Sequence, residues 1–247
     1  MTEPTATPPA PLSLVSRFIG MITAPRATFE NVVANPRPVG ILLVVALIMS
    51  VAAIAPQFTP SGRQAVLDAQ VKAMEGFGME VTPEIYEKME ASSRSTFSKV
   101  SGMMGTFIGL PIICLIFAAL YWAFFNVALG GTASFKPVLA IVTHSQVIGA
   151  IGALAALPIQ LMTGKFTATG PFNLGALAPM LEEGSLLANV LGFITVFGIW
   201  GFIVNAIGLA VLYRRNSRNI SIALLALYVI FAVVVGLVAS AFTARAS

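Results

Sequence analysis

Five long runs without a charged residue constrain the fold of this chain more than any other feature of its sequence. About 20 apolar residues at 1.5 Å per residue cover about 30 Å, so a run of that length crosses the hydrocarbon core of a bilayer as one helix. Backbone groups in lipid must pair internally, and these runs are continuously apolar rather than alternating, which favours helices over a barrel. The charge-free runs are residues 38–62, 100–135, 137–164, 184–213 and 219–244.

Composition supports the same interpretation. Hydrophobic residues make up 57% of the 247 positions and charged residues only 10%, whereas about a quarter of a soluble domain is charged. A stretch at 166–181 is also uncharged, but it is short and rich in glycine and proline, so we expect a loop near the headgroups. The sequence predicts an all-α, polytopic membrane helix bundle with five transmembrane helices, at about residues 39–55, 103–129, 138–162, 187–213 and 220–242.

The segment before the first span carries apolar residues at helical spacing. Residues 1–11 are rich in proline and threonine and predict a disordered cytoplasmic tail. Residues 12–36 predict two short amphipathic helices, separated before Pro25, that lie on the cytoplasmic face of the membrane. A packed cap over the helix bundle is the alternative, and both descriptions can hold at once.

The first external loop, residues 56–102, predicts a helical hairpin. Gly76 and Gly78 break its first apolar stripe, and Thr82 followed by Pro83 is a favourable helix start. Acidic residues along the loop form either a cation site or a solvated charged face, and we favour the solvated face because their spacing does not resemble a calcium loop. These acids are Glu75, Glu80, Glu84, Glu87 and Glu90. We predict no metal and no cofactor.

The distribution of basic residues predicts the orientation. Arg214, Arg215 and Arg218 crowd a short turn without a nearby acid, whereas the basic residues of the first loop are spread among acids. Positive residues favour the cytoplasmic side, so we expect a cytoplasmic N-terminus and an external C-terminus. Basic residues at membrane edges indicate anionic lipid rather than nucleic acid as the partner. The predicted headgroup contacts are Arg17, Arg26, Arg37, Lys136, Arg214, Arg215 and Arg218.

Polar side chains inside the spans are the candidates for a functional site. His144 is the one ionisable residue at membrane depth among them, and placing such a group there costs a few kcal/mol. It has either a structural role, hydrogen-bonding a neighbouring helix or reaching the headgroups, or a role in handling protons or substrate, and we favour the structural role. The candidates are His144, Ser145, Gln146, Asn205, Thr195 and Asn126.

Small residues along the spans predict where helices approach one another closely, because association in lipid depends on backbone packing. The same surfaces permit a homo-oligomer. The predicted packing residues are Gly105, Gly109, Gly149, Gly152, Gly201 and Gly208.

The sequence lacks the usual catalytic and metal-binding patterns. It contains no HExxH, no GxSxG, no CxxC pair and no phosphate-binding GxxxxGK. Cys114 is the single cysteine, so no intramolecular disulfide forms. We therefore expect a protein that is not an enzyme.

Four stretches together resemble the Yip (Ypt-interacting protein) membrane family, in its bacterial branch. The resemblance implies five spans in the inner membrane with a cytoplasmic N-terminus and a short external C-terminus. Eukaryotic members bind Rab-type GTPases in vesicle traffic, although their acidic DLYGP-like segment has no counterpart here. The stretches are RFIGMITAPRATFENVVANPRP, GGTASFKPVLAIVTHSQVIGAIGAL, GPFNLGALAPML and FGIWGFIVNAIGLAVLYRRNSRNISIALLAL.

Two hypotheses for function follow. The first is a non-enzymatic membrane-organising or protein-interaction component, comparable to a trafficking protein, that engages anionic lipid and an unknown membrane or cytoplasmic protein through its N-terminal helices and basic turns. The second is a small-solute channel or transporter with a polar path near His144 and Asn205.

Overall fold

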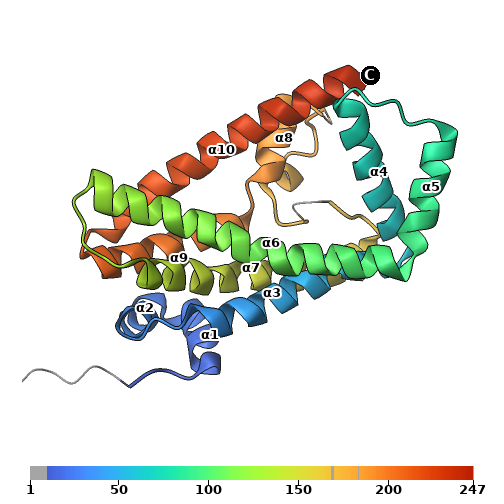
Figure 1. Cartoon of the computed structure of the whole chain (residues 1–247). Helices are drawn as coiled ribbons and strands as arrows, with labels where there is room; N and C mark the ends of the chain where they lie inside the picture. Colours follow the sequence, from blue (N-terminus) through green and yellow to red (C-terminus); the bar gives the residue numbers. More distant parts are fainter. Residues whose placement is uncertain (1–9, 168–169, 183, 247) are drawn as a thin grey trace, which may run out of the picture.

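The computed structural model describes residues 10–167, 170–182 and 184–246, and helices make up most of this part of the chain (Figure 1). Five helices are long and apolar enough to cross a membrane, as the charge-free runs predict. They are α3 (Pro38–Ile54, continued by a 3-10 turn at Ala55–Phe58), α6 (Thr96–Ala123, continued by a π turn at Phe124–Ala128), α7 (Phe135–Thr163), α9 (Val196–Tyr213) and α10 (Ser217–Ala246).

Shorter helices lie at the two ends of this bundle. The predicted pair of N-terminal helices is present as α1 (Leu14–Thr23) and α2 (Pro25–Ala34). The predicted hairpin of the first loop is present as α4 (Pro60–Gly76) and α5 (Pro83–Arg94), and the Thr82 hydroxyl accepts a hydrogen bond from the N–H of Ile85 at the start of α5. The predicted disordered tail lies mostly outside the described residues.

Helix α7 lies at the centre of the bundle. It packs against α3, α6, α9 and both N-terminal helices, and its Val138, Ile141, Val147 and Ile148 are buried in the core. The helices α6 and α10 lie on the outside and expose many large apolar side chains. A water-soluble protein rarely exposes apolar surface on this scale, so these faces are suited to contact lipid.

The bundle has two distinct ends. Because five helices cross in alternating directions, the N-terminal helices α1 and α2 and the C-terminal end of α10 lie at opposite ends of the bundle (Figure 1). We call the end that carries α1, α2 and the α9–α10 turn the α1–α2 end, and we call the other the α4–α5 end. The connection at residues 129–134 also lies at the α1–α2 end.

The N-terminal helices form a packed cap as well as an amphipathic surface. Phe29 of α2 is fully buried and reaches α9 at Gly208, where an added Cβ would lie 3.0 Å from the Phe29 ring. On α1, Met21 is fully buried, whereas Val15 is 65% exposed and Ile19 is 52% exposed. Both descriptions allowed by the sequence therefore apply, α2 being mainly a cap and α1 presenting an outward apolar face.

The fourth span differs from its predicted extent of 187–213. A short helix α8 (Leu186–Phe193) ends before Thr195, and α9 begins at Val196. The chain breaks there because the second loop pairs with it: the N–H of Leu174 donates to the carbonyl oxygen of Ile194 at 2.8 Å. A threonine hydroxyl also competes with the helical pattern and caps a new helix. The spanning helix is therefore only α9.

The predicted glycine contacts are only partly present. An added Cβ at Gly152 would lie 2.7 Å from the Phe197 ring, and one at Gly208 would lie 2.5 Å from Ile141, so both positions require glycine. The other four positions were predicted wrongly as close helix contacts. An added Cβ would meet nothing within 4 Å at Gly105, Gly109 and Gly201, and at Gly149 it would meet only the Gln146 side chain, at 3.6 Å.

Helix α6 shows why a glycine pattern alone misleads. This helix packs against the bundle through buried Leu110, Cys114 and Ala118, which follow one another at intervals of four residues. That stripe is a different face of α6 from the glycine positions, because residues four apart share one face of a helix. Gly105 is therefore exposed.

Shortening the Phe29 side chain tests the cap. Phe29→Ala empties a fully buried site against α9 and is expected to destabilise the protein by about 3–5 kcal/mol. Thermal unfolding of the purified full-length protein in detergent measures the loss, with Val15→Ala as the control on the exposed face of α1. Equal unfolding temperatures for the two variants would show that α2 does not contribute to the folded core.

Candidate functional site

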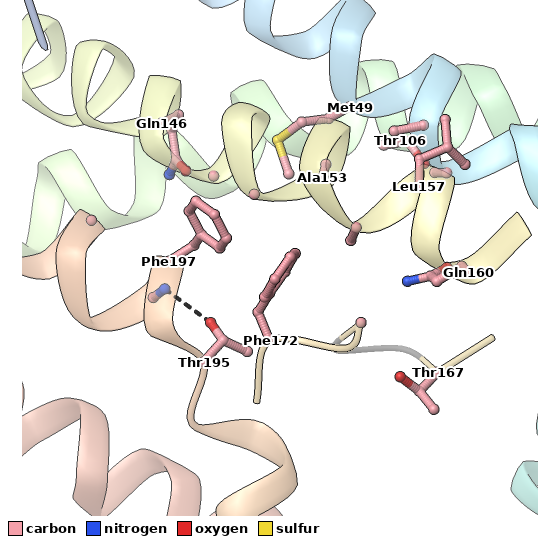
Figure 2. A pocket seen from close by; sticks show the side chains of 18 of the residues that line it. Met49, Thr106, Gln146, Ala153, Leu157, Gln160, Thr167, Phe172, Thr195 and Phe197 are labelled. Carbon is pink, nitrogen blue, oxygen red and sulfur yellow. Dashed lines mark hydrogen bonds between the residues drawn. The ribbon is translucent and has the colours of Figure 1, made fainter. Parts of the chain in front are cut away.

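Four of the six predicted polar candidates line a single cavity of about 860 Å³. They are contributed by two helices, α7 and α9, with Thr195 immediately before α9. Figure 2 shows Gln146 and Gln160 on α7, facing Thr195, Phe197 and the second loop. The four candidates are Ser145, Gln146, Thr195 and Asn205.

The cavity lies in the part of the bundle nearer the α4–α5 end. Its walls come from α3, α4, α6, α7 and α9, and part of the second loop covers it with Phe166 and Phe172. Gln146 and Gln160 are 14 residues apart on α7, so the polar lining extends about 21 Å along that helix. Among the described residues that line the cavity there is no Asp, Glu, Lys, Arg or His.

Asn205, Ser145 and Gln146 supply polar groups to the lining where α7 and α9 lie side by side. The Ser145 hydroxyl donates to the carbonyl oxygen of Ile141 at 2.9 Å, one helical turn earlier. Gln146 lines the cavity one residue further along α7. Asn205 is only 8% exposed, and its side-chain oxygen is buried without a hydrogen-bond partner. That oxygen therefore lacks a hydrogen-bond partner within the described part of the protein.

Thr195 organises the side of the cavity where the fourth span breaks. Its hydroxyl accepts from the N–H of Gly198 at 2.9 Å, which starts α9 (Figure 2). Its own N–H donates to the Tyr228 hydroxyl at 3.1 Å, and that hydroxyl donates to the carbonyl oxygen of Phe193 at 2.9 Å. Tyr228 thus satisfies both backbone groups that the break leaves unpaired.

Aromatic rings fill the space between this break and α7. Phe172 of the second loop meets Phe197 edge to face, with ring centroids 5.3 Å apart. Phe197 in turn lies over Gly152, the glycine of α7 that leaves room for it. The second loop is therefore held in the bundle by stacking as well as by backbone pairing.

Two predicted candidates lie outside the cavity. His144 is fully buried, and its Nδ1 lies 2.7 Å from the carbonyl oxygen of Ala140 in the preceding turn. The amide nitrogen of Asn126 donates to the carbonyl oxygen of Ala133 at 2.7 Å, and the Trp122 indole donates to the same oxygen. Asn126 therefore holds the 129–134 connection, and His144 belongs to the packed core.

Arg17 was predicted as a headgroup contact, and the structure places it inside the protein. It is 3% exposed, its Nε donates to the carbonyl oxygen of Leu12, and its Nη2 donates to that of Asn35. Burial, together with the charge of Arg37, lowers the pKa of the Arg17 guanidinium. Arg17 shares the inward face of α1 with Met21, four residues on, which the charge pattern alone did not reveal.

The other six predicted headgroup contacts are exposed at the α1–α2 end. One of them, Arg215, also donates to the carbonyl oxygen of Leu129 at 3.0 Å and so joins the α9–α10 turn to the 129–134 connection. The exposed residues are Arg26, Arg37, Lys136, Arg214, Arg215 and Arg218.

Sequence reasoning missed the contribution of α4 to the cavity. Gln70 lines the cavity together with Ala65, Ala69 and Ala73, three alanines at intervals of four residues. In the sequence, this repeat of small residues was the pattern that could have identified a face of α4 that lies close to other helices. No group of three or more His, Cys, Asp or Glu side chains able to hold a metal ion occurs within the described residues.

Removing the Tyr228 hydroxyl tests the arrangement at the break. Tyr228→Phe leaves the Thr195 N–H and the Phe193 carbonyl unpaired and is expected to cost about 1–3 kcal/mol of stability. Thermal unfolding in detergent measures this loss of stability, with Tyr86→Phe on the exposed hairpin as the control. If Tyr228→Phe unfolds at the wild-type temperature, the hydroxyl does not hold the break.

Comparison with known proteins identifies the family. The Yip1 domain family model matches residues 19–240. A curated relative, "Membrane protein YknW" of Bacillus subtilis (strain 168), is 26% identical over 227 residues, which cover 90% of this chain and 91% of the relative. No solved structure matches the chain. A match over nearly the whole chain, on a bundle with five membrane-spanning helices, shows that this integral membrane protein belongs to the Yip1 domain family.

Proposed function

We propose that the protein is a non-enzymatic membrane-organising component of the inner membrane that engages anionic lipid and a protein partner through its α1–α2 end. The observation that carries the proposal is the unequal charge of the two ends. Six exposed basic residues lie at the α1–α2 end, where Glu30 is the one acid among the described residues, and it pairs with Arg26 at 3.6 Å. At the α4–α5 end, basic residues are mixed with acids.

The charge difference has two physical consequences. Basic residues next to spans favour the cytoplasmic side, so the proposal places the α1–α2 end in the cytoplasm and the C-terminus outside. Each Lys or Arg near an anionic leaflet contributes about 1 kcal/mol of attraction. The exposed Arg214 and Arg218 in the α9–α10 turn are placed for this attraction.

The outward face of α1 supports the same assignment. Most of its exposed side chains are apolar, and they lie on a short helix that packs against the bundle through its opposite face. An apolar face next to basic residues is typical of helices that lie in the interface between headgroups and acyl chains. The exposed apolar residues are Leu14, Val15, Ile19 and Ile22.

The packing does not favour conduction, the alternative function. Beyond the cavity, towards the α1–α2 end, Ile141 and Phe29 meet at Gly208 and fill the interior. His144 lies outside the cavity that Asn205 lines, so the expected polar path near these two residues is not continuous. Catalysis is not part of the proposal, because the nucleophilic Ser145 has no basic side chain beside it among the described cavity residues.

Cysteine labelling tests the orientation. In a Cys114→Ala background, a membrane-impermeant maleimide added to intact cells is expected to label the Lys88→Cys variant of α5. The Lys136→Cys variant at the start of α7 should be labelled only after the cells are opened, because the two positions lie at opposite ends of the bundle. The reverse pattern would invert the proposed topology.

Retention of anionic lipid tests the role of the α1–α2 end. Arg214→Gln/Arg218→Gln is expected to lower the preference for phosphatidylglycerol over phosphatidylcholine by about fivefold per residue, measured by native mass spectrometry of full-length protein released from mixed nanodiscs.

The control is Lys72→Gln/Lys88→Gln at the α4–α5 end, which should leave the preference unchanged. Equal loss in both variants would contradict the proposal. Deleting residues 12–35 is not a clean test, because it removes Met21 and Phe29 from the core.

A further inference from the structure

We propose that the cavity binds one uncharged, hydroxyl-bearing lipid, with a hydroxyl group donating to Asn205 and the acyl chains lying among the apolar walls. The inference does not depend on the proposed function of the α1–α2 end. It rests on the charge, shape and unpaired polar group of the cavity, and on its position inside the membrane-spanning bundle.

The lining selects against a charged ligand. No ionisable carboxylate, amine, guanidinium or imidazole lines the cavity in the described chain, so a charged headgroup would lose its hydration without meeting an opposite charge. A ligand without any formally charged group avoids that penalty. The amides and hydroxyls in the lining, such as those of Gln146, Gln160 and Thr195, match a neutral headgroup.

Asn205 supplies the specific polar contact. Its side chain is more than nine-tenths buried, it lines the cavity, and its oxygen has no hydrogen-bond partner. A buried acceptor left unpaired is costly, because it has given up water without a replacement. A ligand hydroxyl is a donor, and it is the group that this oxygen lacks.

The remaining walls are suited to hydrocarbon. Alanines, Met49, Leu157, Phe172 and Phe197 make up much of the lining, between the polar groups of α7 (Figure 2). A volume of about 860 Å³ is in the range of sites that enclose a molecule the size of a drug or a lipid fragment. Four of the five helices that line the cavity are membrane-spanning, so the surrounding bilayer is the source of the ligand.

One glycine of the cavity and one outside it allow the space itself to be tested. An added Cβ at Gly201, which lines the cavity, meets no atom within 4 Å. Gly201→Leu therefore fills the cavity without a direct clash at Cβ. Gly105 on α6 has equally open surroundings but does not line the cavity, so Gly105→Leu is its matched control.

The experiment measures lipid bound to the full-length protein. Native mass spectrometry follows release from nanodiscs of phosphatidylcholine that contain equal amounts of dioleoylglycerol and dioleoylphosphatidylglycerol. We expect one retained dioleoylglycerol per protein. Asn205→Leu should lower its retention about three- to tenfold, the effect of one lost hydrogen bond, and Gly201→Leu should abolish it.

Controls separate this result from a general loss of structure. Ser50→Ala likewise removes a buried polar group that has no partner, in this case a hydroxyl outside the cavity. This variant and Gly105→Leu should both retain dioleoylglycerol. Thermal unfolding of each variant in detergent shows whether it is folded.

Three outcomes would overturn the proposal. The first is no retained dioleoylglycerol in the wild type, which indicates a water-filled cavity. The second is retention that Gly201→Leu leaves unchanged in a folded protein, and the third is displacement by free glycerol at equal concentration, which indicates a water-soluble polyol.

Discussion

The structure depends on one constraint: helices that are surrounded by lipid associate only where they pack closely against one another. Helix α7 meets this constraint through close packing, and two glycines permit the closest approaches. Phe197 lies over Gly152, and Ile141 and Phe29 lie over Gly208. In lipid, where the hydrophobic effect does not drive helices together, such contacts between large and small side chains supply the association energy. The same contacts determine where the interior is filled and where it is left open.

The open region follows from the break in the fourth span. Because α9 begins only at Val196, the second loop can pair with residues 194–196 and place Phe172 against Phe197. Tyr228 of α10 then satisfies the two backbone groups at the break. An unbroken helix over 187–213 would leave no strand-like segment for the loop to join. A local capping interaction at Thr195 thus contributes to the walls of a cavity inside the bundle.

The sequence predicted those features that depend on solvent preference and on local backbone chemistry. Charge-free length identified the five spans, and the glycine break with Thr82 and Pro83 identified the hairpin. The sequence-based predictions were wrong for contacts that depend on which face of a helix meets a neighbouring helix. Gly105 and Gly109 are small, yet α6 packs through Leu110 and Cys114 instead.

The location of the polar side chains also depends on which helix faces meet a neighbour. Sequence reasoning singled out His144 as the one ionisable candidate and placed Asn205 beside it as an uncharged polar candidate. Only the arrangement of the helices separates them, since His144 lies within the core and Asn205 lines the cavity with its oxygen unpaired. Arg17 is the opposite case, a charged residue near a membrane edge that is buried. The fold places the carbonyl oxygens of Leu12 and Asn35 where its guanidinium can donate to them.

The two proposed binding regions are physically separate, and this separation has a consequence for function. The basic residues lie at the α1–α2 end, and the cavity lies nearer the α4–α5 end, with the packed layer around Phe29, Ile141 and Gly208 between them. In that layer Phe29 and Ile141 pack closely against Gly208, so we expect any influence of one region on the other to travel through movement of α7 or α9. Both helices are held on several sides, and dense packing resists gradual deformation. A lipid in the cavity and a partner at the α1–α2 end are therefore expected to bind independently unless α9 shifts as a whole against α7.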